Sequence, residues 1–358
     1  MKPTLREIAR QARVHQSTAS CVLNGSGGST RVSAETRQRV LDIARQLGYT
    51  ANRAAQQLRT RRSQVIGLLV GELENPFFAR LVSLCTAELE KAGYESVLAM
   101  RRQNEVSDLH LLQTLASRQV DGLLIWSESI TEIRQWLEAA PRTPNAVVLG
   151  YELPGCDTVA AALDGGVRAA MQHLIDQGYQ RIGYLAPDYA MHSVGDPRAD
   201  VYRESLRAAG RPPYLYPYGG ASHTPEAARV RAEEIACQRP EERPDALLCF
   251  NDMTAVGALM GLRRKGLRVP YDIALVGCDD LPIVSQMDVP ITSIAYPLEE
   301  ICRTAVAMLL DRLDSDRIQG GDIPPRYRLL PTTLSVRESS GDSSVPTLTP
   351  PDEGAGRS

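Results

Sequence analysis

Two groups of polar side chains in this sequence have the chemistry needed to recognise other molecules. The first lies near the N-terminus, where Gln16, Ser17, Thr18 and Ser20 stand at the start of a short helical stretch. A glutamine side chain can form two hydrogen bonds with adenine, and hydroxyl groups can reach bases or phosphates. These residue types at one helix end favour DNA recognition. The alternative is that the hydroxyls only solvate a small helix.

Three short helices are predicted to position this first group. Thr4–Glu7 has the residues of a capping box, so a helix should begin at Leu5. A tight turn over Gln11–His15 should lead into a second helix from about Gln16 to Leu23. Ser33 should cap a third helix, which ends at Gly48. Three helices with such a turn form a helix-turn-helix, whose second helix enters the major groove.

The distribution of charge supports DNA as the partner of this segment. Residues 1–64 contain 12 lysines and arginines against 3 acidic residues, and the rest of the chain contains 28 against 40. A basic head on an acidic body is typical of a nucleic-acid-binding module. Arg31, Arg37 and Arg53 are the candidate phosphate contacts. An unfolded basic tail is the alternative, which the helical pattern and caps disfavour.

Composition argues against several other classes. The seven cysteines are scattered without a CxxC pair, so we expect neither a zinc site nor a disulfide framework. The first residues contain no apolar signal region, and no run of about 18 apolar residues occurs. We therefore expect a cytoplasmic protein with no membrane segment, metal or cofactor.

The second polar group lies in the body of the chain, where the sequence pattern changes. From Val65 onwards, short apolar runs alternate with amphipathic stretches, which predicts an α/β fold with buried parallel strands. Roughly 270 residues of this pattern favour two lobes with a ligand in the crevice between them. Strands are predicted at Val65–Val70, Glu95–Met100, Gly122–Trp126, Ala146–Leu149, Val159–Leu163, Ile182–Leu185, Ala246–Phe250 and Ile273–Val276.

A series of motifs follows one another along the chain. They are TLREIARQARVHQSTASCVLNG, RVSAETRQRVLDIARQLGY, NRAAQQLRTRRSQVIGLLV, ENPFF at 74–78, HLIDQGYQRIGYL at 173–185, FNDMTAVGAL at 250–259, GLRVPYDIALVGCDDLP at 266–282 and PITSI at 290–294. Together, over about 335 residues, they resemble the lactose-repressor/galactose-repressor (LacI/GalR) family of transcriptional regulators.

The resemblance implies an all-α helix-turn-helix head, a hinge helix, and a two-lobed core like that of periplasmic sugar-binding proteins. Residues 1–50 would be the DNA-binding domain, 51–64 the hinge helix and linker, and 65–338 the effector-binding and dimerisation domain. Residues 339–358, which are rich in Pro, Ser and Gly, are expected to be disordered. The implied partners are double-stranded operator DNA, a small polar effector such as a sugar, and a second copy of the chain.

By the same resemblance, Asn52–Leu58 is the hinge helix. Leu58 matches the leucine that the family inserts into the minor groove, and Ala55 and Gln56 match its other groove-facing positions. Such an apolar wedge unstacks a base step and bends the DNA. Leu58 packed on the head or core is the alternative. Thr4, before the first helix, completes the candidate DNA contacts.

The resemblance places the effector site between the lobes. Arg198 matches the family's effector-binding arginine, and Asn251 and Asp279 match polar residues of its later motifs. Phe77 and Phe78 match positions that line the cleft. Arginine and carboxylate groups suit a polyhydroxylated ligand. The alternatives are that Asn251 caps a helix, that Asp279 belongs to a turn, and that the phenylalanines are core.

Four features depart from the family pattern and leave the operator sequence open. Cys21 stands where many members have a guanine-reading arginine, and a thiol cannot make that bidentate contact. Arg13 replaces a usual turn glycine, and His15 replaces the usual capping serine, so the second helix is expected to have a poorer cap. The loop Ser26–Arg31 is about three residues longer than the common form.

Two alternative classes are an enzyme and a plain two-lobed binding protein whose basic head reads no specific DNA sequence. The chain contains no GxSxG, P-loop, HExxH or complete GxGxxG motif. Neither class explains the basic residues 1–64, and this segment therefore favours the regulator, with repression as its expected effect.

We expect Leu58→Ala to weaken binding to the specific operator while non-specific, salt-driven binding stays largely intact. The reason is that the wedge acts only on DNA it bends, whereas non-specific binding depends on phosphate charge. Gel-shift titrations of operator and random duplexes at two salt concentrations measure both. Equal losses for the two duplexes would mean that Leu58 has only a structural role.

Overall fold

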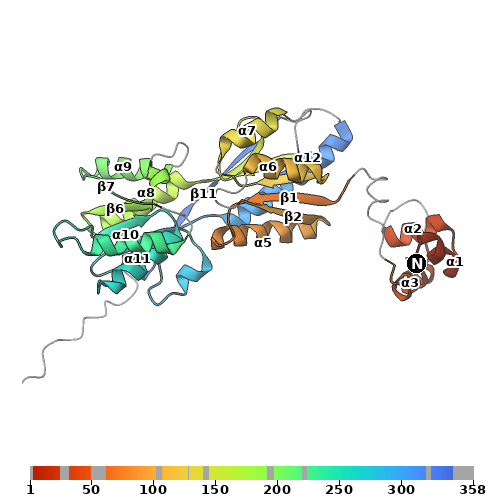
Figure 1. Cartoon of the computed structure of the whole chain (residues 1–358), viewed down its shortest axis with the longest axis horizontal. Coiled ribbons are helices and arrows are strands. Elements are labelled where there is room, and N and C mark those ends of the chain that lie inside the picture. The colour runs from red at the N-terminus through yellow and green to blue at the C-terminus, as the bar shows by residue number, and fades with distance from the viewer. Residues whose placement is uncertain are drawn as a thin grey trace, which may run out of the picture. The chain divides into compact units, whose positions relative to one another are not determined.

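The computed structural model describes most of the chain, which divides into two compact units, residues 1–63 and 64–358. The described residues are 3–24, 32–49, 62–101, 107–127, 129–139, 145–191, 197–219, 224–319 and 324–341. The sequence-predicted hinge helix, the long loop of the head and most of the tail lie outside these residues. Figure 1 labels the elements in both units.

The N-terminal unit, called the head below, contains three helices among its described residues, as the sequence predicts. They are α1 (Leu5–Gln11), α2 (Gln16–Asn24) and α3 (Ala34–Gln46). The Thr4 hydroxyl accepts a hydrogen bond from the Glu7 amide at 3.3 Å, and the Ser33 hydroxyl accepts one from Thr36 at 3.2 Å. Each cap satisfies an amide that the first helical turn leaves unpaired. Apolar residues of all three helices meet in one small core.

The larger unit, called the body below, contains two six-stranded sheets. The sheet of lobe 1 has the order β11-β5-β4-β3-β1-β2, and the sheet of lobe 2 has the order β12-β10-β9-β8-β6-β7. The strands of lobe 1 are β1 (Val65–Val70), β2 (Glu95–Met100), β3 (Gly122–Ile125), β4 (Ala146–Leu149), β5 (Asp157–Ala162) and β11 (Tyr327–Pro331). Those of lobe 2 are β6 (Ile182–Pro187), β7 (Tyr214–Tyr218), β8 (Ala246–Cys249), β9 (Ala274–Asp279), β10 (Thr292–Ala295) and β12 (Thr333–Ser335).

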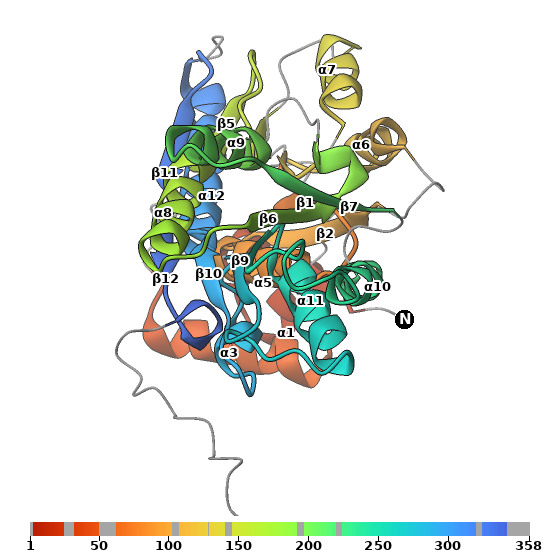
Figure 2. The same cartoon turned by 90° about the vertical axis from the view of Figure 1, so that its left-hand side faces the viewer.

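Helices cover both faces of each sheet, because the central strands are apolar on both sides. In lobe 1 these are α5 (Pro76–Lys91), α6 (Asp108–Ser117), α7 (Ile130–Ala139) and α12 (Leu298–Gln319). In lobe 2 they are α8 (Leu163–Asp176), α9 (Pro197–Ala208), α10 (Pro225–Ala236) and α11 (Asp252–Arg264). Figure 2 shows α8 and α9 on one side of the lobe 2 strands and α10 and α11 on the other. A separate apolar core fills each side.

Two features differ from the sequence-based expectation of parallel sheets and a tail from residue 339. Strand β12 pairs with β10 antiparallel, although the other strand pairs are parallel. Ser339 and Ser340, assigned to the tail from sequence, are buried in lobe 2. The Ser339 hydroxyl accepts a hydrogen bond from the Thr292 amide at 2.8 Å and donates one to the Leu275 carbonyl at 2.6 Å.

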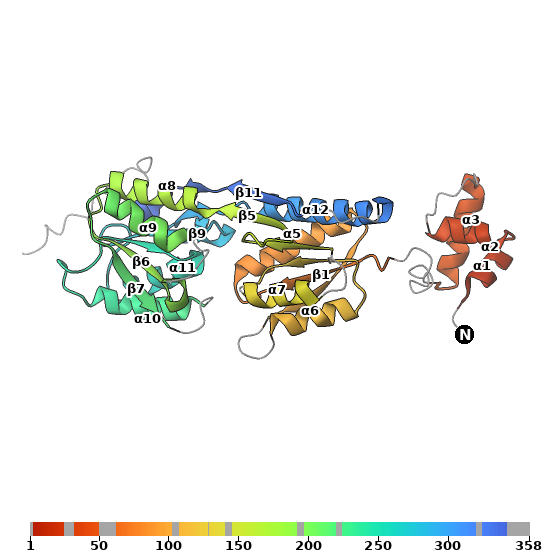
Figure 3. The same cartoon turned by 90° about the horizontal axis from the view of Figure 1, so that it is seen from above.

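The chain passes between the lobes three times. The first crossing joins β5 to α8 after Ala162, and the second joins β10 to α12 through Tyr296 and Pro297. The third joins β11 to β12 through Thr332. Lobe 1 is therefore completed by α12 and β11, which follow all the central strands of lobe 2 in sequence. Figure 3 shows α12 and β11 alongside the earlier elements of the body.

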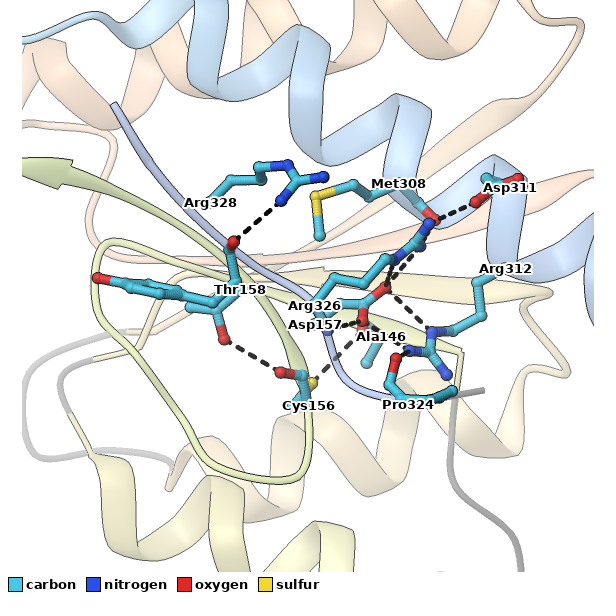
Figure 4. Close-up of polar contacts among 11 residues, drawn as sticks. Ala146, Cys156, Asp157, Thr158, Met308, Asp311, Arg312, Pro324, Arg326 and Arg328 are labelled. Atoms are coloured by element: carbon cyan, nitrogen blue, oxygen red, sulfur yellow. Dashed lines mark hydrogen bonds and ion pairs between the residues drawn. The ribbon is translucent and has the colours of Figure 1, made fainter. Parts of the chain in front are cut away.

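A buried carboxylate fixes α12 and β11 to lobe 1 (Figure 4). Asp157, the first residue of β5, has no exposed side-chain surface, and its oxygens accept hydrogen bonds from Arg312 Nη2 at 2.6 Å and Arg326 Nη2 at 2.7 Å. The Arg326 amide donates to the same carboxylate at 2.8 Å. Burial raises the pKa of Asp157, but these hydrogen bonds outweigh burial and hold the pKa below its usual value.

We expect Asp157→Asn to lower the free energy of unfolding by about 3–5 kcal/mol, because it leaves the buried Arg312 without its counterion. The Arg312 side chain is only 6 % exposed. Urea denaturation of the full-length protein measures the change. The matched control is Glu299→Gln, which removes the exposed partner of Arg80 and should change the free energy by less than about 1 kcal/mol.

The same variant gives a pH test. Because folding lowers the pKa of Asp157, its stabilisation is present above the unfolded pKa and is lost as the pH falls through the folded pKa. The difference in unfolding free energy between wild type and Asp157→Asn should therefore shrink below about pH 4. A difference that stays constant from pH 7 to pH 3 would show that the charge of Asp157 is not what stabilises the fold.

Candidate functional site

The polar end of α2 is accessible, as a DNA-reading helix requires. Gln16 and Ser17 are exposed on its first turn, and Thr18 and Ser20 are half-buried. Val22 faces the core of the head. The four sequence-predicted base contacts therefore lie together at one end of a helix that its apolar side holds in place. Their contact with DNA stays a prediction.

Two unusual residues shape the turn before α2. Arg13 has a φ of 56°, in the left-handed region that glycine adopts more easily. The Nδ1 atom of His15 lies 3.4 Å from the Ser17 amide nitrogen and 2.8 Å from the Ser17 hydroxyl. The imidazole ring thus takes the capping position at the start of α2, where sequence alone predicted a poorer cap.

The other predicted DNA contacts fall into two sets. Thr4 and Arg37 are exposed on the head, with the Thr4 hydroxyl also capping α1 and Arg37 on the first turn of α3. The residues outside the described part of the chain are Arg31, Asn52, Arg53, Ala55, Gln56 and Leu58. Their predicted contacts with DNA stay predictions.

In the body, Arg198 is held rigidly near the start of α9. Its guanidinium lies over the Phe250 ring at 3.7 Å from the ring centroid, and its Nη1 atom donates a hydrogen bond to the Phe250 carbonyl at 2.6 Å. A guanidinium stacked on an aromatic ring keeps its remaining N–H groups in a fixed direction. Sequence analysis identified Arg198 but not Phe250, because only the fold brings α9 against the end of β8.

Asp279, another residue that the sequence predicts at the effector site, lies at the end of β9. Burial raises the pKa of Asp279 well above its usual value, the charge of Asp252 raises it further, and the charge of Arg198 lowers it. Asp279 and Asp280 have φ values of 123° and 52°, both in the left-handed region. Strained backbone of this kind in consecutive residues is concentrated at functional sites. The contact of Arg198 and Asp279 with an effector stays a prediction.

Four aromatic rings pack together around the start of α5. The Phe77 centroid lies 5.0 Å from that of Trp126 and 5.3 Å from that of Tyr296, with edge-to-face geometry. Phe77 and Phe78 are buried, whereas Trp126 and Tyr296 are half-buried and keep accessible surface. Burial raises the pKa of the Tyr296 phenol, and the nearby charge of Asp279 raises it further. Sequence analysis missed Trp126 and Tyr296.

Asn251 is used in another way. Its Oδ1 atom accepts hydrogen bonds from the amide and the hydroxyl of Thr254, both at 2.8 Å, and it caps α11 while being only 4 % exposed. This geometry matches the alternative role that the sequence left open, a helix cap. The effector contact predicted for Asn251 would have to come from its amide nitrogen.

The neighbouring Asp252 holds the strand ends around Asp279 in position. Its carboxylate accepts hydrogen bonds from the Leu281 amide at 2.7 Å and the Ser293 hydroxyl at 2.6 Å. A Cβ atom on Gly277 would lie 2.3 Å from Asp252 Oδ1, so this close approach needs glycine. Burial raises the pKa of Asp252 to about 6. Sequence analysis missed this residue, because nothing in the spacing shows that it bridges β9 and β10.

Among the described residues, His, Cys, Asp and Glu side chains form no group of three or more that could hold a metal ion. None of the helices in this part of the chain has the length and apolar character that a bilayer crossing requires.

Comparison with known proteins agrees with these features. Residues 4–52 match "Bacterial regulatory proteins, lacI family", and residues 171–340 match "Periplasmic binding protein-like domain". The chain is 34 % identical to the HTH-type transcriptional regulator CelR of Thermobifida fusca over 348 residues, which cover 94 % of this chain and 98 % of CelR.

Solved structures give the same result. The lac repressor dimer bound to operator and the anti-inducer ONPF is 26 % identical, with a TM-score of 0.79 over 95 % of this chain and 99 % of that chain. The CelR–cellobiose complex is 31 % identical, with a TM-score of 0.64 over 94 % of this chain and 99 % of that chain. The chain therefore belongs to the lacI family of bacterial regulatory proteins and is a DNA-binding transcriptional regulator.

Proposed function

We propose that this protein is a repressor that binds a palindromic operator as a homodimer and is controlled by a sugar or sugar derivative. The observation that carries the proposal is Arg198, whose guanidinium is fixed on the Phe250 ring, together with the buried carboxyl group of Asp279 and the half-buried rings of Trp126 and Tyr296. The operator-bound lac repressor dimer and cellobiose-bound CelR support the proposed partners. Its proposed place of action is the cytoplasm, where a bacterial operator lies.

The chemistry of this group of residues suits a polyhydroxylated ligand. The guanidinium of Arg198 is a fixed set of donors, and a carboxylate such as Asp279 accepts hydrogen bonds from hydroxyl groups. Aromatic rings such as Trp126 and Tyr296 cover the apolar face of a sugar ring. A ligand that contacts both sets of residues contacts both lobes at once, so its binding free energy depends on the angle between the lobes.

Ligand and operator would then act on one equilibrium between two arrangements of the lobes. The ligand binds one of the two arrangements more tightly than the other, and so does the operator. The free energy that couples the two binding events is typically about 1–3 kcal/mol. Linkage requires the effect to be reciprocal, so operator DNA must change sugar affinity by the same factor as sugar changes operator affinity. Unequal factors measured in the same buffer would contradict this mechanism.

The experiment that tests the proposal is selection of bound sites from random duplex DNA with the full-length protein, followed by sequencing. A palindrome with half-sites spaced for two symmetric heads is the expected result. Repeating the selection with cellobiose present tests ligand control in the same format. Binding that only follows salt concentration, with no enriched sequence under either condition, would favour a ligand-binding protein that does not read specific DNA.

We expect Gln16→Ala and Arg37→Ala to weaken binding in different ways. Loss of a bidentate glutamine contact should relax the preference at one base pair of each half-site by about 1–3 kcal/mol. Loss of a phosphate contact should weaken all duplexes about equally and reduce the salt slope by about one. Anisotropy titrations of the selected operator and its single-base variants separate the two patterns. If Gln16→Ala weakens every duplex equally, Gln16 is not a base contact.

We expect Arg198→Lys to weaken sugar binding at least tenfold, because lysine lacks the planar fork and the stacking on Phe250. Operator affinity without sugar should stay within twofold of wild type. Calorimetric titration with cellobiose, and with a panel of neutral mono- and disaccharides if cellobiose does not bind, measures the loss. Arg207→Lys, an exposed change on the same helix, is the matched control. Wild-type affinity in Arg198→Lys would show that this arginine does not contact the ligand.

A further inference from the structure

A single hydroxyl group joins the first and third crossings between the lobes. Thr332, the residue of the third crossing between β11 and β12, donates a hydrogen bond from its Oγ1 atom to the Ala162 carbonyl at 2.7 Å. The same atom accepts a hydrogen bond from the Gly166 amide at 2.9 Å. Both partners belong to the first crossing, where β5 of lobe 1 ends and α8 of lobe 2 begins.

Thr332 supplies what the first turn of α8 lacks from its own sequence. Ala162 stands at the capping position of α8 and has no side-chain group that could make a capping hydrogen bond. Capping groups normally come from the residue just before a helix, as with Asn75 before α5. Here the hydroxyl comes from a residue 170 positions later. Because this capping group comes from the third crossing, the position of the first turn of α8 depends on the path of β11.

The second crossing also meets this point. A Cβ atom on Gly166 would lie 2.4 Å from Ile294 of β10 and 2.5 Å from the Thr332 hydroxyl oxygen. Glycine therefore lets β10, the third crossing and α8 approach one another closely. Ile294 stands two residues before Tyr296, so β10 approaches Gly166 close to where the second crossing begins.

The strands that lead to this point are held firmly in lobe 1. Strands β5 and β11 pair in parallel register from Thr158–Tyr327 to Ala162–Pro331. At the start of both strands, Asp157 binds Arg312 of α12 and Arg326 (Figure 4). A paired ribbon anchored by buried ionic hydrogen bonds resists bending along its length. A change in the angle between the lobes must therefore take place where the pairing ends, next to Thr332.

We propose that Thr332 is a positioning residue whose hydroxyl couples the first and third crossings, so that ligand-driven movement of lobe 2 is transmitted to lobe 1 as a single rotation. This inference rests on the proposed function, because it concerns how ligand and operator binding are coupled. Thr332 touches neither ligand nor DNA in this account. Its loss should change the coupling between the two binding events more than it changes either affinity by itself.

The test compares Thr332→Val, which keeps the shape and removes the hydroxyl, with Thr332→Ser, which keeps the hydroxyl. Operator affinity of each full-length protein is measured by fluorescence anisotropy with and without saturating cellobiose, and the ratio of the two values is the coupling factor. We expect the factor to fall at least fivefold in Thr332→Val and to stay within twofold of wild type in Thr332→Ser. A wild-type factor in Thr332→Val, or equal losses in both variants, overturns the inference.

A second measurement separates this inference from the proposed function. If wild type binds no specific operator or does not respond to cellobiose, the proposed function fails for that ligand, and hydrogen exchange of the ligand-free protein decides the inference. The Gly166 amide should then exchange at least tenfold faster in Thr332→Val than in wild type or Thr332→Ser. Amides of the central strand β6 should exchange equally in all three. Equal Gly166 rates in the three proteins would overturn the inference.

Discussion

The two sheets of the body share no strand, so three short crossings make every covalent link between the lobes. This constraint decides where the candidate site can lie and which residues can form it. Arg198 and Asp279 come from lobe 2, Trp126 comes from lobe 1, and Tyr296 lies on a crossing itself. A ligand that contacts these residues has its binding free energy tied to the angle between the lobes. In the proposed function, these residues are therefore a sensor as well as a binding surface.

Two buried carboxyl groups in the body have opposite pKa shifts because their surroundings differ. Asp157 accepts hydrogen bonds from two arginines and one amide, which hold its pKa below the usual value. Asp279 has a pKa raised by burial and by a neighbouring carboxylate, and it lies on strained backbone. The first arrangement stabilises one geometry of lobe 1. The second is the kind of environment in which hydrogen bonds from an incoming ligand have the most to add.

Sequence patterns identify the parts of this fold that depend on local chemistry. Apolar runs such as Leu123–Ile125 predict central strands, and the hydroxyls of Thr4 and Ser33 predict helix starts. Strands β7, β10, β11 and β12 were missed, because β7 and β11 lack a continuous buried run and β10 and β12 are short strands that contain Thr and Ser. Trp126 and Tyr296 were missed because their proximity depends on the second crossing, and spacing along the chain carries no information about it. Ser339 stands at the start of a stretch whose composition predicts disorder, and only the fold reveals its hydrogen bonds in lobe 2.

The chain enters the body from the head at a fixed point in lobe 1. The Gln64 amide donates a hydrogen bond to Asp121 at 2.8 Å, and the Gln64 carbonyl accepts one from the Glu95 amide at 2.9 Å. The segment from the head therefore enters the body at a residue that is tied to the sheet of lobe 1. Because the proposed ligand would contact Arg198 and Asp279 of lobe 2 as well as Trp126 of lobe 1, it would act on this entry point by changing the angle between the lobes. In the proposed dimer, rotation of the two copies of lobe 1 changes the separation of the two linkers, and the spacing of operator half-sites is sensitive to that separation.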